Sequence, residues 1–326
     1  MKKAFITGIL GQDGIHLTEF LLSKDYEVHG LINGQRNSNM NSFVVKFPSV
    51  KLHSGDLTDF SSLVRLIDLV HPHEVYNLAA ISFVGMSFAQ PELTANVTGL
   101  GALRVFEAVR TVDKESHIRI YQASSSEMFG KVTQVPQNES TRFHPRSPYG
   151  VAKVFAHYAA QNYREAYGMF ISSGILFNHE GENRGYEFVT RKITSNVARI
   201  KLGKQLNFSL GSLDPKRDWG YAGDYVHAMW KMLQISAPDD FIIATGEAHS
   251  VREFIECALI AAGLEPETEK YVTLDPAFIR PAEVDLLIGD ATKAKEVLGW
   301  SPTKSFTELV GLMVENDLKL ESQSKE

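Results

Sequence analysis

A turn containing three glycines most constrains what this chain can fold into. Gly8, Gly11 and Gly14 lie between two segments of different periodicity. The apolar run at residues 3–7 predicts a strand, and the apolar spacing within residues 15–23 predicts a helix. Such a turn lets the backbone approach a pyrophosphate, and the helix N-terminus presents its amide groups to phosphate. A glycine trio can also be a tight turn alone, but this strand–turn–helix context favours a dinucleotide site.

The alternation of strand and helix patterns continues to residue 176. Further strands are expected at residues 26–32, 50–53, 74–78, 118–122 and 170–176. Helical spacing recurs at residues 61–70, 93–110 and about 149–167. This order predicts an α/β fold whose doubly wound parallel sheet, of the Rossmann type, is covered by helices on both faces.

Beyond about residue 177 the pattern loosens into a smaller, loop-rich part. Loops are expected at residues 178–185, 211–218 and 276–283, and helices near 188–202, 224–234 and 251–262. We therefore expect a Rossmann domain at residues 1–177, to which residues of about 215–245 return. A C-terminal substrate domain is expected mainly at residues 178–318, and the polar residues 319–326 are expected to form a disordered tail.

Charge and composition exclude several classes of function. The 326 residues include 33 Lys and Arg against 39 Asp and Glu, a net charge of −6, so nucleic acid is not an expected partner. Cys257 is the only cysteine, which excludes an internal disulfide and a multi-cysteine metal site, and no metal is expected. No apolar run approaches the roughly 18 residues of a membrane span, so a cytoplasmic protein without a membrane partner is expected.

The end of the second expected strand bears on the choice of dinucleotide. In an NAD site, an acidic residue at this position accepts a hydrogen bond from the ribose 2′-hydroxyl. Here the strand leads into Asn33, Gly34, Gln35 and Arg36, which include no carboxylate. The absent negative charge and the nearby Arg36 favour the 2′-phosphate of NADP. An arginine that is merely solvated in a loop would leave NAD as the alternative.

Tyr149 and Lys153, four residues apart, form a candidate catalytic pair. If Pro148 opens the helix, both side chains lie on one face about 6 Å apart. An ammonium near a phenol lowers the pKa of the phenol towards the range of a general base. The same lysine can hydrogen-bond a nicotinamide ribose. The pair also occurs by chance in helices, so its neighbours decide its meaning.

A serine-rich loop supplies those neighbours. The strand expected at residues 118–122 leads into this loop, which contains Ser125 and Glu127. Open α/β sheets bind ligands at the carboxyl ends of their strands, and hydroxyls placed there can connect a substrate hydroxyl to Tyr149. Hydride transfer needs no carboxylate. Glu127 is therefore either a surface acid that caps the next turn or a second catalytic group, and its position beside the hydroxyls favours catalysis.

Together these segments resemble the extended short-chain dehydrogenase/reductases and, over nearly the whole chain, the GDP-mannose 4,6-dehydratase family. The resemblance rests on the glycine turn, the serine loop and the Tyr149/Lys153 pair. Further matches follow in the same order along the chain, at residues 55–59, 146–149, 174–180, 189–193, 216–220, 244–247, 250–253 and 280–285. It implies a lyase with an internal redox cycle. Oxidation at C4, loss of water across C5 and C6, and hydride return to C6 would convert GDP-mannose into GDP-4-keto-6-deoxymannose for deoxysugar biosynthesis.

The resemblance also implies roles for individual residues. The catalytic residues would be Ser125, Glu127, Tyr149 and Lys153. The cofactor-binding residues would be Gly8, Gly11, Gln12, Asp13, Gly14, Arg36, Asp56, Leu57, Leu78, Ala79, Ala80, Ser82, Lys153, His179 and Arg184. The residues for the GDP-sugar would be Ser82, Asn178, Lys192, Arg217, Arg280 and Glu283, which suits a diphosphate because guanidinium groups bind phosphate with forked donors. The family implies a homodimer or a homotetramer.

Departures from the family's pattern keep alternatives open. Asn33 and Gly34 replace the paired arginines that bind the 2′-phosphate and help to build a tetramer, so NAD and a dimer remain alternatives. Ser125 replaces a threonine and keeps the hydroxyl. Residues 78–85 lack the family's glutamine, histidine and lysine, and Leu93 replaces a tyrosine, so a different GDP-hexose or a GDP-heptose is an alternative substrate. A nucleotide-sugar reductase or epimerase, or a non-catalytic dinucleotide sensor, would fit fewer of these residues.

Overall fold

The computed structural model describes residues 1–34, 40–278, 282, 284 and 286–323. Its centre is a seven-stranded sheet in the order β11-β6-β5-β4-β1-β2-β3, and every pairing in it is parallel. The strands are β1 (Lys3–Thr7), β2 (Glu27–Ile32), β3 (Lys51–Ser54), β4 (Glu74–Asn77), β5 (Arg119–Ser125), β6 (Ile171–Leu176) and β11 (Asp240–Ile243). The predicted α/β fold with a doubly wound parallel sheet is confirmed.

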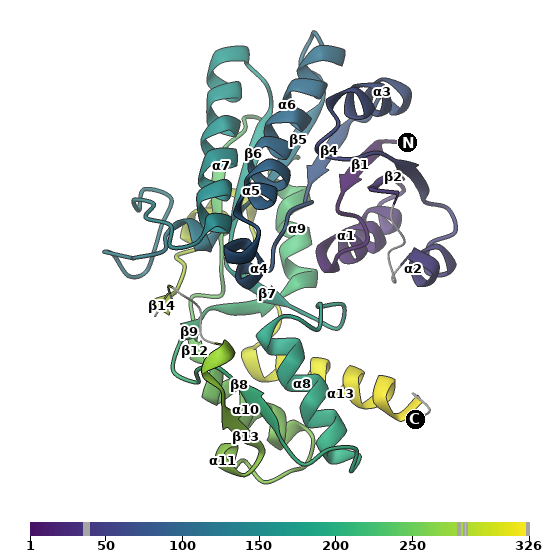
Figure 1. The fold of residues 1–326 in the computed structure, drawn as a ribbon. Helices are drawn as coiled ribbons and strands as arrows, with labels where there is room; N and C mark the ends of the chain where they lie inside the picture. Colours follow the sequence, from purple (N-terminus) through teal and green to yellow (C-terminus); the bar gives the residue numbers. More distant parts are fainter. Residues whose placement is uncertain (35–39, 279–281, 283, 285, 324–326) are drawn as a thin grey trace.

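Helices cover both faces of this sheet (Figure 1). One face packs against α1 (Gln12–Ser23), α2 (Met40–Lys46), α9 (Ala222–Met232) and α12 (Thr292–Leu298). The other face packs against α3 (Phe60–Val70), α6 (Gly101–Val112) and α7 (Pro148–Tyr167). The central strands β4 and β6 are buried along their whole length, as expected for strands that are covered on both sides.

Helix α7 begins and ends where its sequence dictates. Ser147 caps it, because the Ser147 hydroxyl accepts a hydrogen bond from the Gly150 amide at 3.0 Å. Pro148 occupies the first helical position, where its missing amide hydrogen costs nothing. Gly168 ends the helix in the left-handed conformation with φ of 66°. The predicted helix at about 149–167 is therefore confirmed.

A second lobe lies on one side of the sheet, below it in Figure 1. It contains α8 (Val189–Lys201), α10 (Val251–Ala261), α11 (Thr268–Tyr271) and α13 (Phe306–Gln323), with β8 (Phe208–Leu210) paired to β13 (Val272–Leu274). These elements share a core of their own, which includes Val197, Phe254 and Leu309. Three separate stretches of chain build this lobe, since α9, β11 and α12 lie between them in the sequence and pack on the sheet.

The lobe also contains a buried ion pair. Arg191 on α8 lies 2.7 Å from Asp317 on α13, and both side chains are almost fully buried. Thr194 donates a hydrogen bond to the same carboxylate at 2.6 Å. The Arg191 guanidinium also donates to the carbonyl oxygens of Glu182 and Arg184, at 2.6 and 3.1 Å. The pair therefore holds α8, α13 and the segment carrying Arg184 together.

Two expectations about the C-terminal half were wrong. Residues 319–323, expected within a disordered tail, are the last turns of α13. Lys204 holds this end, since its ammonium donates to the Glu321 carbonyl oxygen at 2.5 Å. The expected loops contain short strands, which pair with distant segments: β7 (Asn178–Glu180) with β10 (Trp219–Tyr221), and β9 (Lys216–Arg217) with β12 (His249–Ser250) and β14 (Leu286–Leu287). Strands of two or three residues are too short for a detectable alternation.

The remaining elements are short. They are α4 (Val84–Ala89), α5 (Pro91–Thr94), the π-helical η1 (Ala95–Leu100) and the 3₁₀ turns η2 (Ser126–Met128) and η3 (Pro276–Phe278). Among the residues that the structure describes, no helix combines the length and the apolar character that crossing a bilayer requires.

Candidate active site

A cavity of about 1840 Å³ lies between the sheet and the second lobe. It is at the carboxyl ends of β1, β4, β5 and β6, where the strand order reverses between β1 and β4. Open α/β sheets bind their ligands at such a reversal. Every predicted site residue that the structure describes lines this cavity. Arg36, Arg280 and Glu283 lie outside the described residues.

The glycine turn has the shape that a pyrophosphate requires. Gly8 has φ of 72°, and a Cβ atom on it would lie 2.9 Å from the Ala79 amide nitrogen. A Cβ atom on Gly14 would clash with the carbonyl oxygens of Gly8 and Ile9. Gly11, which has no side chain to cap α1, precedes the first helical amides at the edge of the cavity. A dinucleotide phosphate can therefore approach these amides closely.

The wall beside this turn follows β4 and is tied to β1. The Thr7 hydroxyl donates to the Asn77 amide oxygen at 2.8 Å and accepts from the amides of Leu78 and Ala79, both at 3.1 Å. These bonds fix the segment after β4 beside the glycine turn. Ala80 and Ser82 continue this wall of the cavity.

An ion pair connects the glycine turn to the segment after β6. His179 lies 2.9 Å from the Asp13 carboxylate through its Nε2 atom, and its Nδ1 atom donates to the Phe177 carbonyl oxygen at 2.8 Å. Burial alone would raise the pKa of Asp13, but the charge and hydrogen bond of His179 hold it well below its usual value. Burial alone would lower the pKa of His179, and Asp13 raises it above its usual value. The pair is therefore charged.

Gln12 and Arg184 strengthen this connection. The Gln12 side chain donates to the His179 carbonyl oxygen at 3.0 Å, so α1 is bonded to the start of the second lobe. Arg184 pairs with Glu180 at 2.8 Å, and its guanidinium lies 3.5 Å from the centre of the Phe188 ring. Its positive charge is close enough to lower the pKa of Tyr149.

Tyr149 and Lys153 lie on the buried face of α7, beside the end of β5. The Lys153 ammonium donates to the Ala123 carbonyl oxygen at 2.6 Å and lies 5.6 Å from the centre of the Tyr149 ring. Burial lowers the pKa of Lys153 to about 8. The two side chains thus share one face, as the four-residue spacing predicted.

The expected lowering of the Tyr149 pKa was wrong for the protein alone. Burial raises the pKa of Tyr149 above its usual value, and the Glu127 carboxylate raises it further, while a hydrogen bond with Ser125 lowers it. The prediction considered the neighbouring ammonium and left out the cost of ionising a phenol that is almost fully buried. Glu127 therefore lies within electrostatic reach of the phenol.

Ser125 and Glu127 are placed by the turn that follows β5. The Ser125 hydroxyl accepts a hydrogen bond from the Glu127 amide at 3.2 Å, which starts the η2 turn. Ser125, Glu127, Tyr149 and Lys153 all line the cavity, so the structure brings a phenol, an ammonium, a hydroxyl and a carboxylate together beside the end of β5.

Two cations lie on the far wall, in the second lobe. The Lys192 ammonium is 3.5 Å from the centre of the Phe278 ring, and burial lowers the pKa of Lys192. Arg217 on β9 is buried at the edge of the cavity, and its guanidinium donates to the Lys216 carbonyl oxygen at 2.9 Å. Asn178 lines the same cavity. The sequence did not single out the aromatic rings of Phe188 and Phe278, because cation–ring contacts have no local sequence signal.

This fold and site define an extended short-chain dehydrogenase/reductase of the kind that acts on nucleotide sugars. Solved structures of similar fold agree. A UDP-glucose 4-epimerase of Thermus thermophilus in complex with NAD is 26% identical, with a TM-score of 0.85 over 97% of this chain and 98% of that one. A UDP-glucose 4-epimerase of Thermotoga maritima with UDP-glucose is 25% identical, with a TM-score of 0.85 over 98% and 99% of the two chains.

Sequence comparison identifies the family. The family model described as GDP-mannose 4,6 dehydratase matches residues 5–313. Arabidopsis thaliana "GDP-mannose 4,6 dehydratase 2" is 54% identical over 99% of this chain and 89% of its own length. The human "GDP-mannose 4,6 dehydratase" is 51% identical over 97% and 91% of the two chains. The chain belongs to the GDP-mannose 4,6-dehydratase family, which confirms the resemblance seen in the sequence.

Proposed function

We propose that the protein is a hydro-lyase that converts GDP-mannose into GDP-4-keto-6-deoxymannose. The observation that carries this proposal is the Glu127 carboxylate, which lines the same cavity as the Tyr149 phenol and follows Ser125 at the end of β5. A reductase or epimerase of the same fold needs the phenol and ammonium alone. Membership of the family and about 50% identity to curated relatives over nearly the full chain support the same activity.

The first step is oxidation at C4 of the hexose. Tyr149 takes the proton of the 4-hydroxyl, and Ser125 orients that hydroxyl by bonding to both partners. A dinucleotide held by the glycine turn would supply the acceptor for the C4 hydride and the donor of the same hydride to C6. The Lys153 ammonium and the Arg184 guanidinium stabilise negative charge on the phenol oxygen.

The second step is the loss of water. A ketone at C4 acidifies the C5 proton, and Glu127 removes it. The 6-hydroxyl then leaves as water, with the protonated Glu127 or Ser125 as the proton donor. After the hydride returns to C6, Tyr149 gives the proton that it holds to C5. One water is lost overall and the dinucleotide is unchanged.

The cavity supplies separate places for the cofactor and the GDP-sugar. The amides that follow Gly11 would hold the cofactor pyrophosphate, and Asp56 and Leu57, which line the same cavity, would border the adenine. Lys192 and Arg217 on the far wall bind the substrate diphosphate, which would draw the hexose between them and the catalytic corner. Asn178 and Ser82 hydrogen-bond the sugar.

We propose NADP as the cofactor. Residue Asn33, which follows β2 at the ribose end of the cavity, presents an amide in the place where a carboxylate would repel a 2′-phosphate. Arg36 belongs to the same proposal and lies outside the described residues. Calorimetric titration with NADP⁺ and NAD⁺ tests this preference, and tighter binding of NAD⁺ would overturn it.

We propose that two copies of the chain associate through α7. Val151, Phe155 and Tyr158 are exposed on the face of α7 opposite to the catalytic pair, and Leu93 and Leu100 are exposed on the neighbouring α5 and η1. Exposed apolar side chains on adjoining elements indicate an interface, and a twofold axis would bury those of α7 against their copies. Light scattering distinguishes a homodimer from a homotetramer or a monomer, and Phe155→Lys should weaken the association.

Incubation with GDP-mannose followed by mass spectrometry tests the proposed reaction. The expected product is lighter by one water, and no added cofactor is consumed in proportion to it. Consumption of reduced cofactor would support a reductase. Water loss from another GDP-sugar, with none from GDP-mannose, would change the substrate and keep the chemistry. A cytoplasmic location is part of the same proposal, and cell fractionation tests it.

A further inference from the structure

A third residue of α7 continues the row formed by Tyr149 and Lys153. His157 is one helical turn beyond Lys153 and is almost fully buried. Its Nδ1 atom lies 2.9 Å from the hydroxyl of Ser124, which precedes Ser125 and lines the cavity. Two of these side chains bond consecutive residues at the end of β5, Lys153 to Ala123 and His157 to Ser124, and the next residue, Ser125, lines the cavity together with Tyr149.

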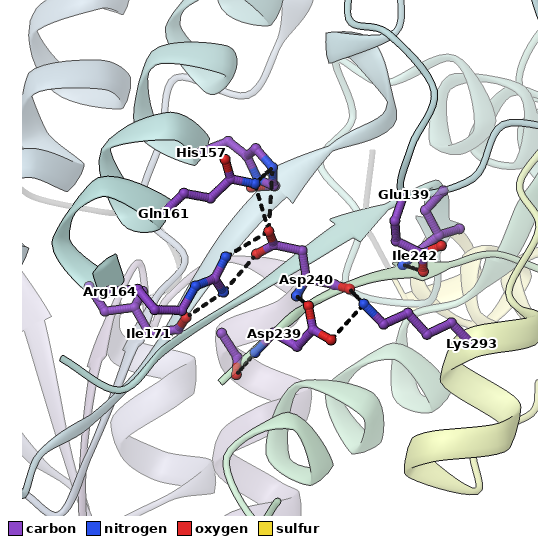
Figure 2. A network of polar contacts seen from close by, with 11 residues as sticks. Glu139, His157, Gln161, Arg164, Ile171, Asp239, Asp240, Ile242 and Lys293 are labelled. Atoms are coloured by element: carbon purple, nitrogen blue, oxygen red, sulfur yellow. Dashed lines mark hydrogen bonds and ion pairs between the residues drawn. The ribbon is translucent and has the colours of Figure 1, made fainter. Parts of the chain in front are cut away.

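His157 is connected in turn to a partly buried ion pair between Arg164 and Asp240 (Figure 2). The Gln161 amide nitrogen lies 3.2 Å from His157 Nε2 and 2.8 Å from the Asp240 carboxylate. Arg164 donates two hydrogen bonds to the same carboxylate, at 3.2 and 2.9 Å. Asp240 is the first residue of β11 at the edge of the sheet. The end of β5 is thus linked through His157 to α7 and to β11.

The hydrogen bonds determine the form of the imidazole. The Gln161 amide has two hydrogens, one for the Asp240 carboxylate and one for His157 Nε2, so Nε2 is an acceptor. The remaining hydrogen of the neutral ring is then on Nδ1 and is donated to the Ser124 hydroxyl. Burial lowers the pKa of His157, with Arg164 acting in the same direction and Asp240 against it, so the ring is neutral at physiological pH.

We propose that His157 is a positioning residue for catalysis: it fixes the segment containing Ser124 and Ser125 against α7, and thereby sets where the Ser125 hydroxyl lies relative to the Tyr149 phenol. Tyr149 and Ser125 lie on separate elements, so their relative placement depends on how α7 and the end of β5 are held together. Lys153 holds Ala123, and His157 is the anchor for the next residue along the strand. The kinetic part of this inference rests on the proposed function.

Two substitutions at one position test the anchor. His157→Phe removes both hydrogen bonds at similar volume, while the Asn side chain of His157→Asn places an amide donor near the position of Nδ1. We expect kcat of His157→Phe to fall about 10²-fold, the cost of a small misplacement in an active site. His157→Asn keeps the bond to Ser124 and loses the one to Gln161, so its kcat should fall only about fivefold.

The pH profile separates positioning from simple loss of stability. The Ser125 bond lowers the pKa of Tyr149, so loosening it raises that pKa. Because Tyr149 acts as a base, the acidic limb of the kcat/KM profile should move to higher pH in His157→Phe, by about 0.5–1 pH unit. His29→Asn is the matched control, since His29 is a buried histidine on β2 that bonds Glu27 and His53, and β2 lies three strands away from β5 in the sheet. It should leave the profile unchanged.

Three results would overturn the inference. The first is a pH profile of kcat/KM in His157→Phe that equals that of the wild type. The second is an equal fall in kcat in His157→Asn and His157→Phe. The third is a His157 ring that carries its hydrogen on Nε2. The last is measured by nitrogen NMR on the wild-type protein without substrate. If GDP-mannose is not the substrate, the wild-type protein fails to turn it over while the NMR result still decides the position of the hydrogen. Failure of this inference and failure of the proposed function are thereby distinguished.

Discussion

Replacing Lys153 by methionine should stabilise the protein while it stops turnover. The Lys153 ammonium is buried, and burial lowers its pKa from 10.5 to about 8. This difference corresponds to about 3 kcal/mol that the fold loses by keeping the ammonium charged at neutral pH. Methionine also removes the hydrogen bond to the Ala123 carbonyl oxygen, which contributes about 1.5 kcal/mol. That oxygen still accepts a hydrogen bond from the side-chain amide of Gln122, at 3.0 Å. The net gain should be about 1–2 kcal/mol at pH 7.

The gain in the free energy of unfolding that methionine gives should fall as the pH rises. Between about pH 8 and pH 10.5 this lysine is protonated in the unfolded chain and deprotonated in the folded one. The unfolded state therefore binds more protons, and the free energy of unfolding of the wild type rises with pH relative to the variant. The advantage of methionine should shrink by up to about 1.4 kcal/mol per pH unit across this window, so it should vanish within the window, near pH 9–9.5, and reverse at higher pH.

Urea unfolding of both proteins between pH 7 and pH 10 measures this difference, because contributions of other groups cancel between the two. Lys114→Met is the matched control, since Lys114 is exposed and its replacement should change the free energy of unfolding little at any pH. Turnover of the Lys153 variant is measured in parallel. A Lys153→Met protein that is less stable than the wild type at pH 7, or a difference that does not change with pH, would refute the reasoning.

Three further substitutions separate the roles proposed above. Tyr149→Phe should lower turnover about 10²–10⁴-fold, the usual contribution of a general base, and should leave the calorimetric affinity for the dinucleotide unchanged; normal turnover would reject Tyr149 as the base. Glu127→Gln should still allow oxidation at C4, seen as transient absorbance of the reduced cofactor, and should prevent the loss of water in the mass spectrum; unimpaired water loss would remove Glu127 from the mechanism. Asp317→Asn should lower the free energy of unfolding by about 3–5 kcal/mol, because it leaves Arg191 charged and buried without its partner. A loss below about 1 kcal/mol in urea unfolding would show that this pair does not support the second lobe.

Elements with a strong local pattern were predictable from the sequence, and elements that depend on distant pairing were not. The six expected strands have apolar runs, and α7 has a serine cap, a proline at its first position and a glycine at its end. Strand β11 begins with a charged residue and is four residues long, so its place beside β6 follows from tertiary packing. Strands β9, β12 and β14 exist only through pairing with one another.

The same division applies to the site. The glycine turn, the pair on α7 and the loop after β5 are local motifs, and all of their predicted residues line the cavity. Phe278 beside Lys192 and His157 beside Ser124 depend on contacts across the fold, so no local motif marks them. The direction of the Tyr149 pKa was missed for a related reason, because burial and the Glu127 charge are set by tertiary structure.

The path of the chain between the two lobes has a consequence for how this protein can be divided. The second lobe is built from three stretches, and α9, β11 and α12 return to the sheet between them. No single cut therefore yields either half intact, and a gene fragment encoding one half would lack strands or helices that the other half's sequence supplies. Recombination with a relative could exchange substrate specificity only through several coordinated crossovers. Point substitution on the cavity wall is the simpler evolutionary route to a new sugar.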